Sequence, residues 1–297
     1  MQLNDWAVQM FITQACRLLM EFDSIKSISI DPQTCTNCGT CMEICPMSLI
    51  IPGSEGVPFM PDEVGAYCTK CGSCEAFCPE GAISPQFKTT HPIISENDVH
   101  AITPGQIGIY MRQRRSIRNY KDRMIDRETI EEILDIVRYS PSGMNNQPVH
   151  WLIIHDPDEV RKLTRLSIEW MRKIHDSDQM HPLKPMVPSL IGAYEAGEDP
   201  ICRGAPHVAI AHAAEANPMA FTDSIIALSW FELVAPAFDM GTCWAGFLKM
   251  AASEHEPLIK ELDLPEGHVV QYAMMFGYPK YKVQNIPGRE PARISWK

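Results

Sequence analysis

The stretch from Cys35 to Pro79 reads CTNCGTCMEICP at residues 35–46 and CTKCGSCEAFCP at residues 68–79. Both segments follow one spacing, Cys-x2-Cys-x2-Cys-x3-Cys-Pro, and the second begins 33 residues after the first. A [4Fe–4S] cluster needs one thiolate on each iron, and three cysteines three residues apart can wrap one cluster from a tight loop. The repeated motif therefore predicts two iron–sulfur clusters.

This double motif resembles that of bacterial ferredoxins, in which the fourth cysteine serves the other cluster. Zinc sites use paired Cys-x2-Cys units without a third cysteine at the same spacing, and disulfides are not expected in a chain without a secretory signal. The resemblance implies Cys35, Cys38, Cys41 and Cys78 as ligands of one cluster, and Cys68, Cys71, Cys74 and Cys45 as ligands of the second.

The composition of the 297 residues is that of a globular protein with about two domains. Hydrophobic residues make up 45% of the chain. The sequence contains no run of about 18 apolar residues, so no membrane span is predicted. The formal charge of −11 argues against nonspecific binding to nucleic acid. The remaining cysteines, Cys16, Cys202 and Cys243, are scattered as reduced thiols of a cytoplasmic protein would be.

The chain divides into four predicted parts. Residues 1–27 form an amphipathic helical extension, because polar residues interrupt what would be the apolar middle of a signal peptide. Residues 28–90 form the ferredoxin-like domain, with short strands near residues 27–30 and 82–84. Residues 91–105 form a linker, and residues 106–297 form a second domain. The first domain holds seven acidic residues against Lys70 and Lys88, which favours a basic docking patch on its electron donor.

The second domain alternates helical and strand patterns, which predicts an α+β fold. Residues 170–200 lack a clear period and predict a mobile flap, and residues 241–247 predict a turn into a short helix. The other expected elements are a helix after Asp126, a helix from about Asp158, a buried helix over 222–238, core strands over 151–154, 207–213 and 269–276, and an extended tail over 277–297.

Basic residues crowd into the segment from Arg112 to Arg123. One interpretation is a solvated helix end. The other is a phosphate clamp, because arginine binds phosphate through a bidentate fork and a serine hydroxyl adds a donor. The segment alone favours neither interpretation.

Three segments in register resemble the nitroreductase family of FMN enzymes: RRSIR at 114–118, PSGMNNQP at 141–148 and GTCWAG at 241–246, followed by Arg289 before a Glu-Pro pair. The similarity covers residue 106 to the end, and the layout resembles the subgroup with a two-cluster ferredoxin module ahead of this domain. It implies a central mixed sheet flanked by helices, and a homodimer with FMN at its interface.

The resemblance also implies which residues hold FMN. Arg114, Arg115, Ser116, Arg118 and Arg289 match residues that bind the FMN phosphate and the polar edge of the flavin. Residues from the other subunit and from the loop along the flavin face complete the set: Pro141, Ser142, Gly143, Asn145, Gln147, Cys243, Trp244 and Gly246. Two positions depart from the family pattern, because Ala245 replaces an acidic residue and Pro287 replaces a basic one.

The two domains together predict an oxidoreductase. Clusters carry single electrons, whereas a flavin accepts them singly and delivers a hydride. An external donor, reduced ferredoxin or NAD(P)H, would load the clusters. FMN would then reduce a nitroaromatic, a quinone or an activated alkene through N5. Alternatives are an electron carrier or redox sensor without a small-molecule substrate, and a dehalogenase or flavin-modifying enzyme of the same fold. Cys243 is expected to pack against the flavin rather than act as a redox thiol.

Overall fold

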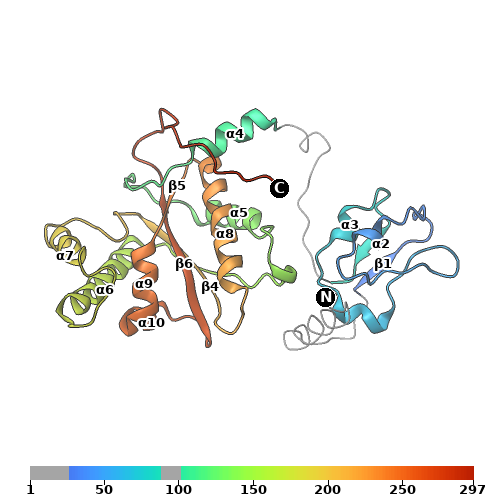
Figure 1. Cartoon of the computed structure of the whole chain (residues 1–297), viewed down its shortest axis with the longest axis horizontal. Helices are drawn as coiled ribbons and strands as arrows, with labels where there is room; N and C mark the ends of the chain where they lie inside the picture. Colours follow the sequence, from blue (N-terminus) through green and yellow to red (C-terminus); the bar gives the residue numbers. More distant parts are fainter. Residues whose placement is uncertain (1–26, 88–101) are drawn as a thin grey trace. The chain divides into compact units, whose positions relative to one another are not determined.

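A computed structural model describes residues 27–87 and 102–297 of the chain (Figure 1). Contacts divide these residues into two compact units, one with the cysteine motifs and one with the large sheet. The predicted helical extension over 1–27 lies outside the described residues except for Ser27, as does most of the predicted linker. Each unit is described by itself.

The cysteine-rich unit is built as two similar halves. Strands β1 (Ile28–Ile30) and β2 (Ile83–Pro85) pair antiparallel, as the alternating pattern predicted. The short helices α2 (Thr40–Ile44) and α3 (Ser73–Ala76) each follow the second cysteine of a motif. Between the halves, the 3-10 helix η1 spans Asp62–Tyr67.

The turns of the two cysteine motifs share one backbone conformation. Asn37 and Gly39 have φ values of 58° and 81°, and their counterparts Lys70 and Gly72 have values of 52° and 70°. A glycine adopts this left-handed region without steric cost, and Gly39 and Gly72 directly precede the two helices. The repeated sequence thus gives two repeated turns, each of which carries the first three cysteines of its motif.

The larger unit is centred on a four-stranded sheet with the strand order β3-β4-β6-β5. All neighbours pair antiparallel, and the parallel pairing of the predicted mixed sheet is present as an isolated bridge between Ser116 and Thr242. The bounds of the strands are β3 (His150–Ile154), β4 (His207–Ala214), β5 (Gly241–Trp244) and β6 (His268–Gly277).

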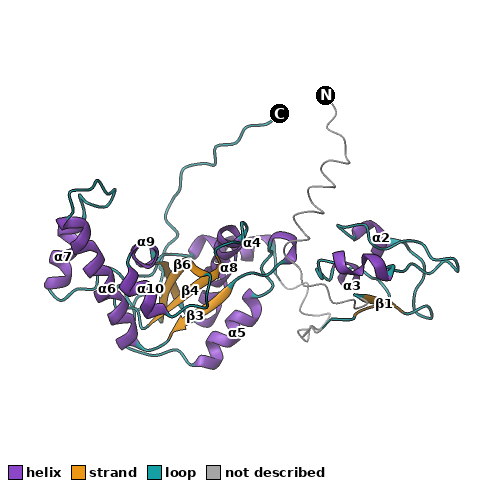
Figure 2. Cartoon of the chain, turned by 90° about the horizontal axis from the view of Figure 1, so that it is seen from below, coloured by secondary structure: helices purple, strands orange, loops and turns teal. Residues whose placement is uncertain are grey.

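Helices cover both faces of this sheet (Figure 2). On β4, Val208 and Ile210 pack into one core with α6, α7, α9 and α10, whereas Ala209 and Ala211 pack into the other core with α5 and α8. This alternation is the two-residue period of a strand that is buried on both faces. The bounds are α5 (Arg127–Val137), α6 (Pro157–Asp176), α7 (Val187–Glu195), α8 (Ala220–Val234), α9 (Gly246–Glu254) and α10 (Glu256–Leu262).

Two sequence predictions differ from the structure. The expected flap over residues 170–200 contains the last turns of α6 and the whole of α7, and Trp170, Met171 and Ile174 are buried. Of the expected turn into a short helix over 241–247, the helix is present as the start of α9, but residues 241–244 form the strand β5, paired with β6. A four-residue strand is too short to show a period, and its conformation comes from its neighbour in the sheet.

Helix α8 and the following 3-10 helix η3 (Ala235–Phe238) are long and apolar enough to cross a membrane by length and composition alone. Their contacts are those of a core element, because Ala227, Leu228 and Phe231 are buried against the sheet. The helix also contains the buried acidic residues Asp223 and Glu232. These features match a helix of a protein core.

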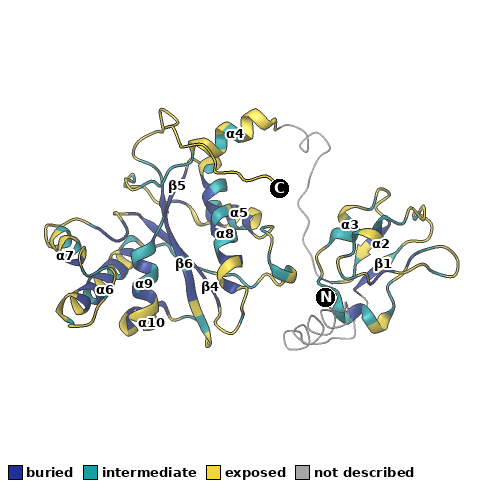
Figure 3. Ribbon diagram, viewed as in Figure 1, coloured by how far each residue is buried: buried dark blue, intermediate teal, exposed yellow. Residues whose placement is uncertain are grey.

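Helix α4 (Pro104–Gln113) differs from the core helices because none of its residues is buried (Figure 3). Its start is stabilised by a capping box, in which Thr103 and Gln106 satisfy each other's backbone N–H. Ile107, Ile109 and Met111 each expose more than two fifths of their surface. The helix leads directly into the basic segment predicted to bind phosphate.

Candidate cofactor sites

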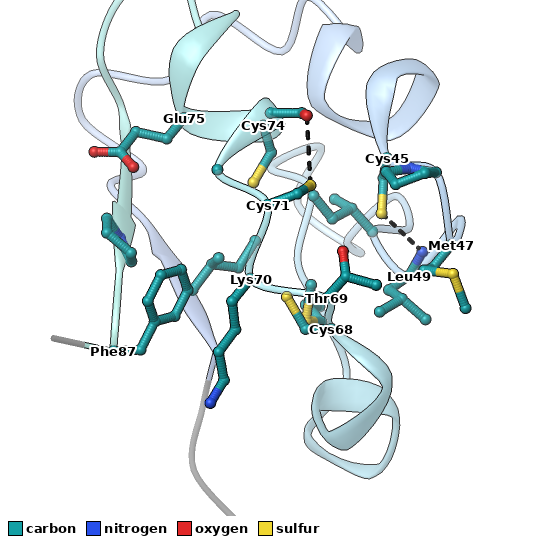
Figure 4. A pocket seen from close by; sticks show the side chains of 17 residues that line it. Cys45, Met47, Leu49, Cys68, Thr69, Lys70, Cys71, Cys74, Glu75 and Phe87 are labelled. Atoms are coloured by element: carbon teal, nitrogen blue, oxygen red, sulfur yellow. Dashed lines mark hydrogen bonds between the residues drawn. The ribbon is translucent and has the colours of Figure 1, made fainter. Parts of the chain in front are cut away.

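Each half of the cysteine-rich unit surrounds a hollow lined by four cysteines. One hollow gathers Cys45 from the first motif with three cysteines of the second (Figure 4). The other gathers Cys78 with three cysteines of the first motif. The structure therefore brings together the same two sets that the ferredoxin resemblance implied: Cys45, Cys68, Cys71 and Cys74, and Cys35, Cys38, Cys41 and Cys78.

The fourth cysteine of each motif is supported by the backbone. The amide of Leu49 donates to Cys45 Sγ at 3.4 Å, and the amide of Ala82 donates to Cys78 Sγ at 3.3 Å. Burial, followed by the nearby Cys68, Cys71 and Cys45, raises the pKa of Cys74 to about 11. Four thiols around one hollow fit a [4Fe–4S] cluster, which needs one thiolate on each iron.

The basic segment lies along strand β5. Ser116 forms the parallel bridge to Thr242, and the Ile117 amide donates to the Thr242 carbonyl at 2.8 Å. A Cβ atom on Gly241 would lie only 2.5 Å from Ile117 Cγ1, so this position requires glycine. Two of the motifs recognised in the sequence are thus hydrogen-bonded neighbours.

A carboxylate from α8 joins the same two segments. Glu232 Oε1 accepts from Arg114 Nη1 at 3.0 Å, and Glu232 Oε2 accepts from Trp244 Nε1 at 3.2 Å. The Trp244 ring stands edge-on to Tyr272, with centroids 5.0 Å apart. Gly246, at the start of α9, would place a Cβ 3.4 Å from the Tyr272 hydroxyl. The end of β5 is therefore closely packed.

Cys243 is buried beside two cationic side chains. Burial raises the pKa of its thiol, and the Arg118 guanidinium, the Ser116 side chain and Arg203 partly oppose this rise. Cys243 thus stays a neutral thiol at pH 7, which fits the expected packing role. Arg118 and Arg203 place positive charge near Cys243, where a phosphate or an anionic flavin would be attracted, and Glu232 places one negative charge there.

The loop from Pro141 to Gln147 is held at the other end of α8. The Gly143 amide donates to Asp223 Oδ1 at 3.0 Å, and the Gln147 amide donates to Ser142 Oγ at 3.0 Å. Gln147 has a positive φ of 47°, and Met144 and Asn145 have positive values as well. Three non-glycine residues in this costly conformation mark the loop as a candidate binding segment.

Within one protomer this loop is separated from Arg114 and Trp244. Asp223 and Glu232 are nine residues apart on α8, which corresponds to roughly 14 Å along a helix. The C-terminal tail leaves the body of the unit (Figure 2). Arg289 lies on this tail, is exposed, and donates to the neighbouring Gly288 carbonyl at 3.3 Å. Arg115 donates to the Arg114 carbonyl at 2.5 Å. The residues implied for FMN thus lie in three places: at each end of α8 and on the tail.

Comparison with known proteins accounts for both units. Residues 111–278 match the family model described as the nitroreductase family. The chain belongs to the nitroreductase family. Residues 34–83 match a 4Fe-4S dicluster domain, which confirms the prediction of two [4Fe–4S] clusters ahead of the nitroreductase domain. The predicted family and the enzyme class, an oxidoreductase, are also confirmed.

Relatives and solved structures resemble the nitroreductase domain. A protein of Archaeoglobus fulgidus, provisionally named NADH dehydrogenase/NAD(P)H nitroreductase, is 28% identical over 56% of this chain and 82% of its own length. The match with an FMN-bound nitroreductase of Desulfitobacterium hafniense covers 63% of this chain and 96% of that protein's chain, at 18% identity and a TM-score of 0.51. The match with FMN-bound iodotyrosine deiodinase covers 64% of this chain and 98% of that protein's chain, at 16% identity and a TM-score of 0.50. These structures confirm the predicted fold.

Three residues of the nitroreductase domain near these segments were missed by the sequence analysis: Asp223, Glu232 and Arg203. Asp223 and Glu232 are acidic residues in an otherwise apolar helical stretch, and both are buried. A charged residue that interrupts a core pattern was the available signal, because burial of a carboxylate requires a partner. Arg203 gave no signal beyond its charge.

Proposed function

We propose that this nitroreductase-family protein is an FMN-dependent oxidoreductase that receives electrons through its two [4Fe–4S] clusters. When bound, FMN supplies hydride from N5 to a small electrophile such as a nitroaromatic, a quinone or an activated alkene. The observation that carries the proposal is the presence in one chain of two four-cysteine hollows and a nitroreductase domain whose arginine-rich segment lies along strand β5. Single-electron carriers and a two-electron cofactor in one protein allow electrons that arrive singly to leave as a pair.

The residues of the nitroreductase domain have distinct proposed roles. Arg114, Arg118 and Ser116 bind the phosphate and polar edge of FMN, because arginine and hydroxyl donors match phosphate oxygens. Cys243 and Trp244 lie along the flavin face, where buried side chains exclude water. Arginines near the flavin stabilise its anionic reduced form. The other proposed contacts are Arg115, Arg289, Pro141, Ser142, Gly143, Asn145, Gln147 and Gly246.

A homodimer is part of the proposal. The loop at Gly143 and the Arg114 region lie at opposite ends of α8. In the proposed dimer, the loop of one copy reaches the FMN held by the Arg114 region of the other. Helix α4 and the tail expose apolar residues that a partner would cover, among them Ile109 and Trp296. Sedimentation of the FMN-loaded protein tests this: a monomer that binds FMN with full occupancy contradicts it.

Anaerobic stopped-flow absorbance tests the electron route. Reduced ferredoxin and NAD(P)H are compared as donors, and the iron–sulfur and flavin bands are followed separately. We expect the clusters to bleach before the flavin with ferredoxin. Direct reduction of the flavin by NAD(P)H, with the clusters lagging behind, would reverse the proposed direction. Purified protein that takes up no FMN would contradict the function as a whole.

A further inference from the structure

Glu232 occupies an unusual position for a carboxylate. It lies in the apolar helix α8 and exposes only 8% of its surface. Each of its oxygens accepts one hydrogen bond, from Arg114 and from Trp244, at 3.0 Å and 3.2 Å. A buried carboxylate is costly unless it is paired in this way. Through these two bonds Glu232 joins Arg114, 118 residues before it, to Trp244, 12 residues after it.

We propose that Glu232 is a positioning residue of the flavin site, which orients Arg114 and Trp244 and sets the charge that the flavin experiences. The inference rests on the proposed function, because it concerns the same FMN site. Arg114 belongs to the proposed phosphate-binding segment, and Trp244 ends the strand at the proposed flavin face. A single rigid group that bonds both fixes the spacing between these two parts of the site.

The neighbouring loop cannot supply this carboxylate itself. No acidic residue stands between Gly241 and Phe247, and Ala245 is buried with 1% exposure. The side chains bonded to Glu232 come from the end of α4 and the end of β5, so α8 reaches both from one core position. Tyr272 packs edge-on against the Trp244 ring and so restricts the orientation of this ring as well.

The charge of Glu232 has a direct consequence for the flavin. Arg114, Arg118 and Arg203 bring positive charge to this end of the sheet, and the Arg114–Glu232 ion pair removes one unit of it. A reduced flavin carries more negative charge than an oxidised one, so uncompensated arginine favours reduction. Glu232 thus holds the FMN potential lower than the arginines alone would set it.

The test is the FMN midpoint potential of the dithionite-titrated holoprotein in three variants. Glu232→Gln keeps the size of the side chain and removes its charge, and we expect the potential to become more positive. Arg114→Gln removes the cation, and we expect it to become more negative. In the double variant the pair is removed together, so the potential returns towards that of the wild type.

Glu261→Gln is the matched control, because Glu261 is paired with Lys162 between α6 and α10 and its loss should leave the potential unchanged. An unchanged potential in Glu232→Gln with FMN bound overturns the inference and leaves the proposed function intact. Wild-type protein without FMN would instead overturn the proposed function. If Glu232→Gln fails to fold, Arg114→Gln tests the same ion pair from its more exposed side, and an unmoved potential there also overturns the inference.

Discussion

At the scale of single residues, the fourth cysteine of each motif lies close in sequence to one set of cysteines and close in space to the other set. Cys45 lies in the first motif, yet it lines the hollow of Cys68, Cys71 and Cys74. The proline that follows each fourth cysteine directs the chain away from its own loop. Ligand assignment by nearest neighbours in sequence would therefore group the cysteines differently from the structure.

Replacing Cys45 by serine tests this crossing. We expect the variant to lose the cluster that is held mainly by the second motif, and to retain roughly half of its iron, because one of two [4Fe–4S] clusters remains. Electron paramagnetic resonance of the reduced protein and iron analysis provide the measurement. Cys202→Ser is the control, because Cys202 is buried in the nitroreductase domain. If C45S and C41S perturb the same cluster signal, the assignment is wrong.

Histidines in the core predict an acid-sensitive stability. Burial, with His268 and His150 nearby, lowers the pKa of His212 to about 4. Because the unfolded histidine titrates near 6.5, the unfolded state takes up the proton first as the pH falls. The stabilisation is complete above pH 6.5 and is lost between pH 6.5 and 4, by up to about 3 kcal/mol.

Urea unfolding at pH 7.5 and pH 5 measures this effect through tryptophan fluorescence. In His212→Asn, the loss of unfolding free energy between the two pH values should be smaller than in the wild type. Each protein serves as its own reference, so any constant cost of the substitution cancels. Equal losses in both proteins would assign the acid sensitivity to other groups.

At the scale of elements, β5 shows how a segment obtains its conformation from its neighbours. Its four residues pair with β6 on one side and meet residues 116–117 on the other. Gly241 permits this second approach, because any side chain there would overlap Ile117 and Pro279. The basic segment therefore reaches the end of β5 only because one residue lacks a Cβ.

Gly241→Ala should destabilise the nitroreductase domain by about 1–3 kcal/mol, which is typical of overpacking in a tight core. The Cβ would lie 2.5 Å from Ile117 Cγ1 and 2.9 Å from Pro279 Cγ. Urea unfolding gives the free energy. The control is Gly192→Ala in α7, where no atom lies within 4 Å of the added Cβ, and we expect unchanged or slightly higher stability. Equal effects of the two substitutions would exclude the steric explanation.

At the scale of the whole molecule, charge governs the encounter with an electron donor. Residues 28–90 carry seven acidic side chains and two lysines, and the whole chain has a formal charge of −11. Such a surface attracts a basic patch and repels an acidic one over about 10 Å at 0.1 M salt. Donor choice is thus partly an electrostatic property of the ferredoxin-like domain.

Ionic strength tests this property. For a donor with a basic docking patch, the second-order rate of cluster reduction should fall as salt rises from 0.02 M to 0.3 M. For an acidic donor it should rise, because screening weakens repulsion. Stopped-flow absorbance measures both, with an uncharged small reductant as the control. A salt-independent rate with both protein donors would contradict the electrostatic argument.

The sequence alone determined the features that depend on local spacing. The cysteine motifs predicted two clusters, because ligation by neighbouring thiolates imposes a fixed spacing. The strands over 207–213 and 269–276 were predicted because each is a mostly apolar run of seven or eight residues. The helix after Asp126 was predicted because its apolar residues recur at helical spacing. The family followed from three segments in register, each weak by itself.

Only the tertiary structure decided which distant residues meet. Residues 241–244 read as a turn and residues 170–200 as a flap, because neither segment shows a clear hydrophobic period, and their strand and helices depend on packing partners. The contacts of Arg114 with Glu232 and of Glu232 with Trp244 leave no mark in the sequence, since they join three elements across the fold. Local sequence specifies ligand spacing and element type, whereas a buried ion pair depends on how the elements pack, which no spacing in the chain records.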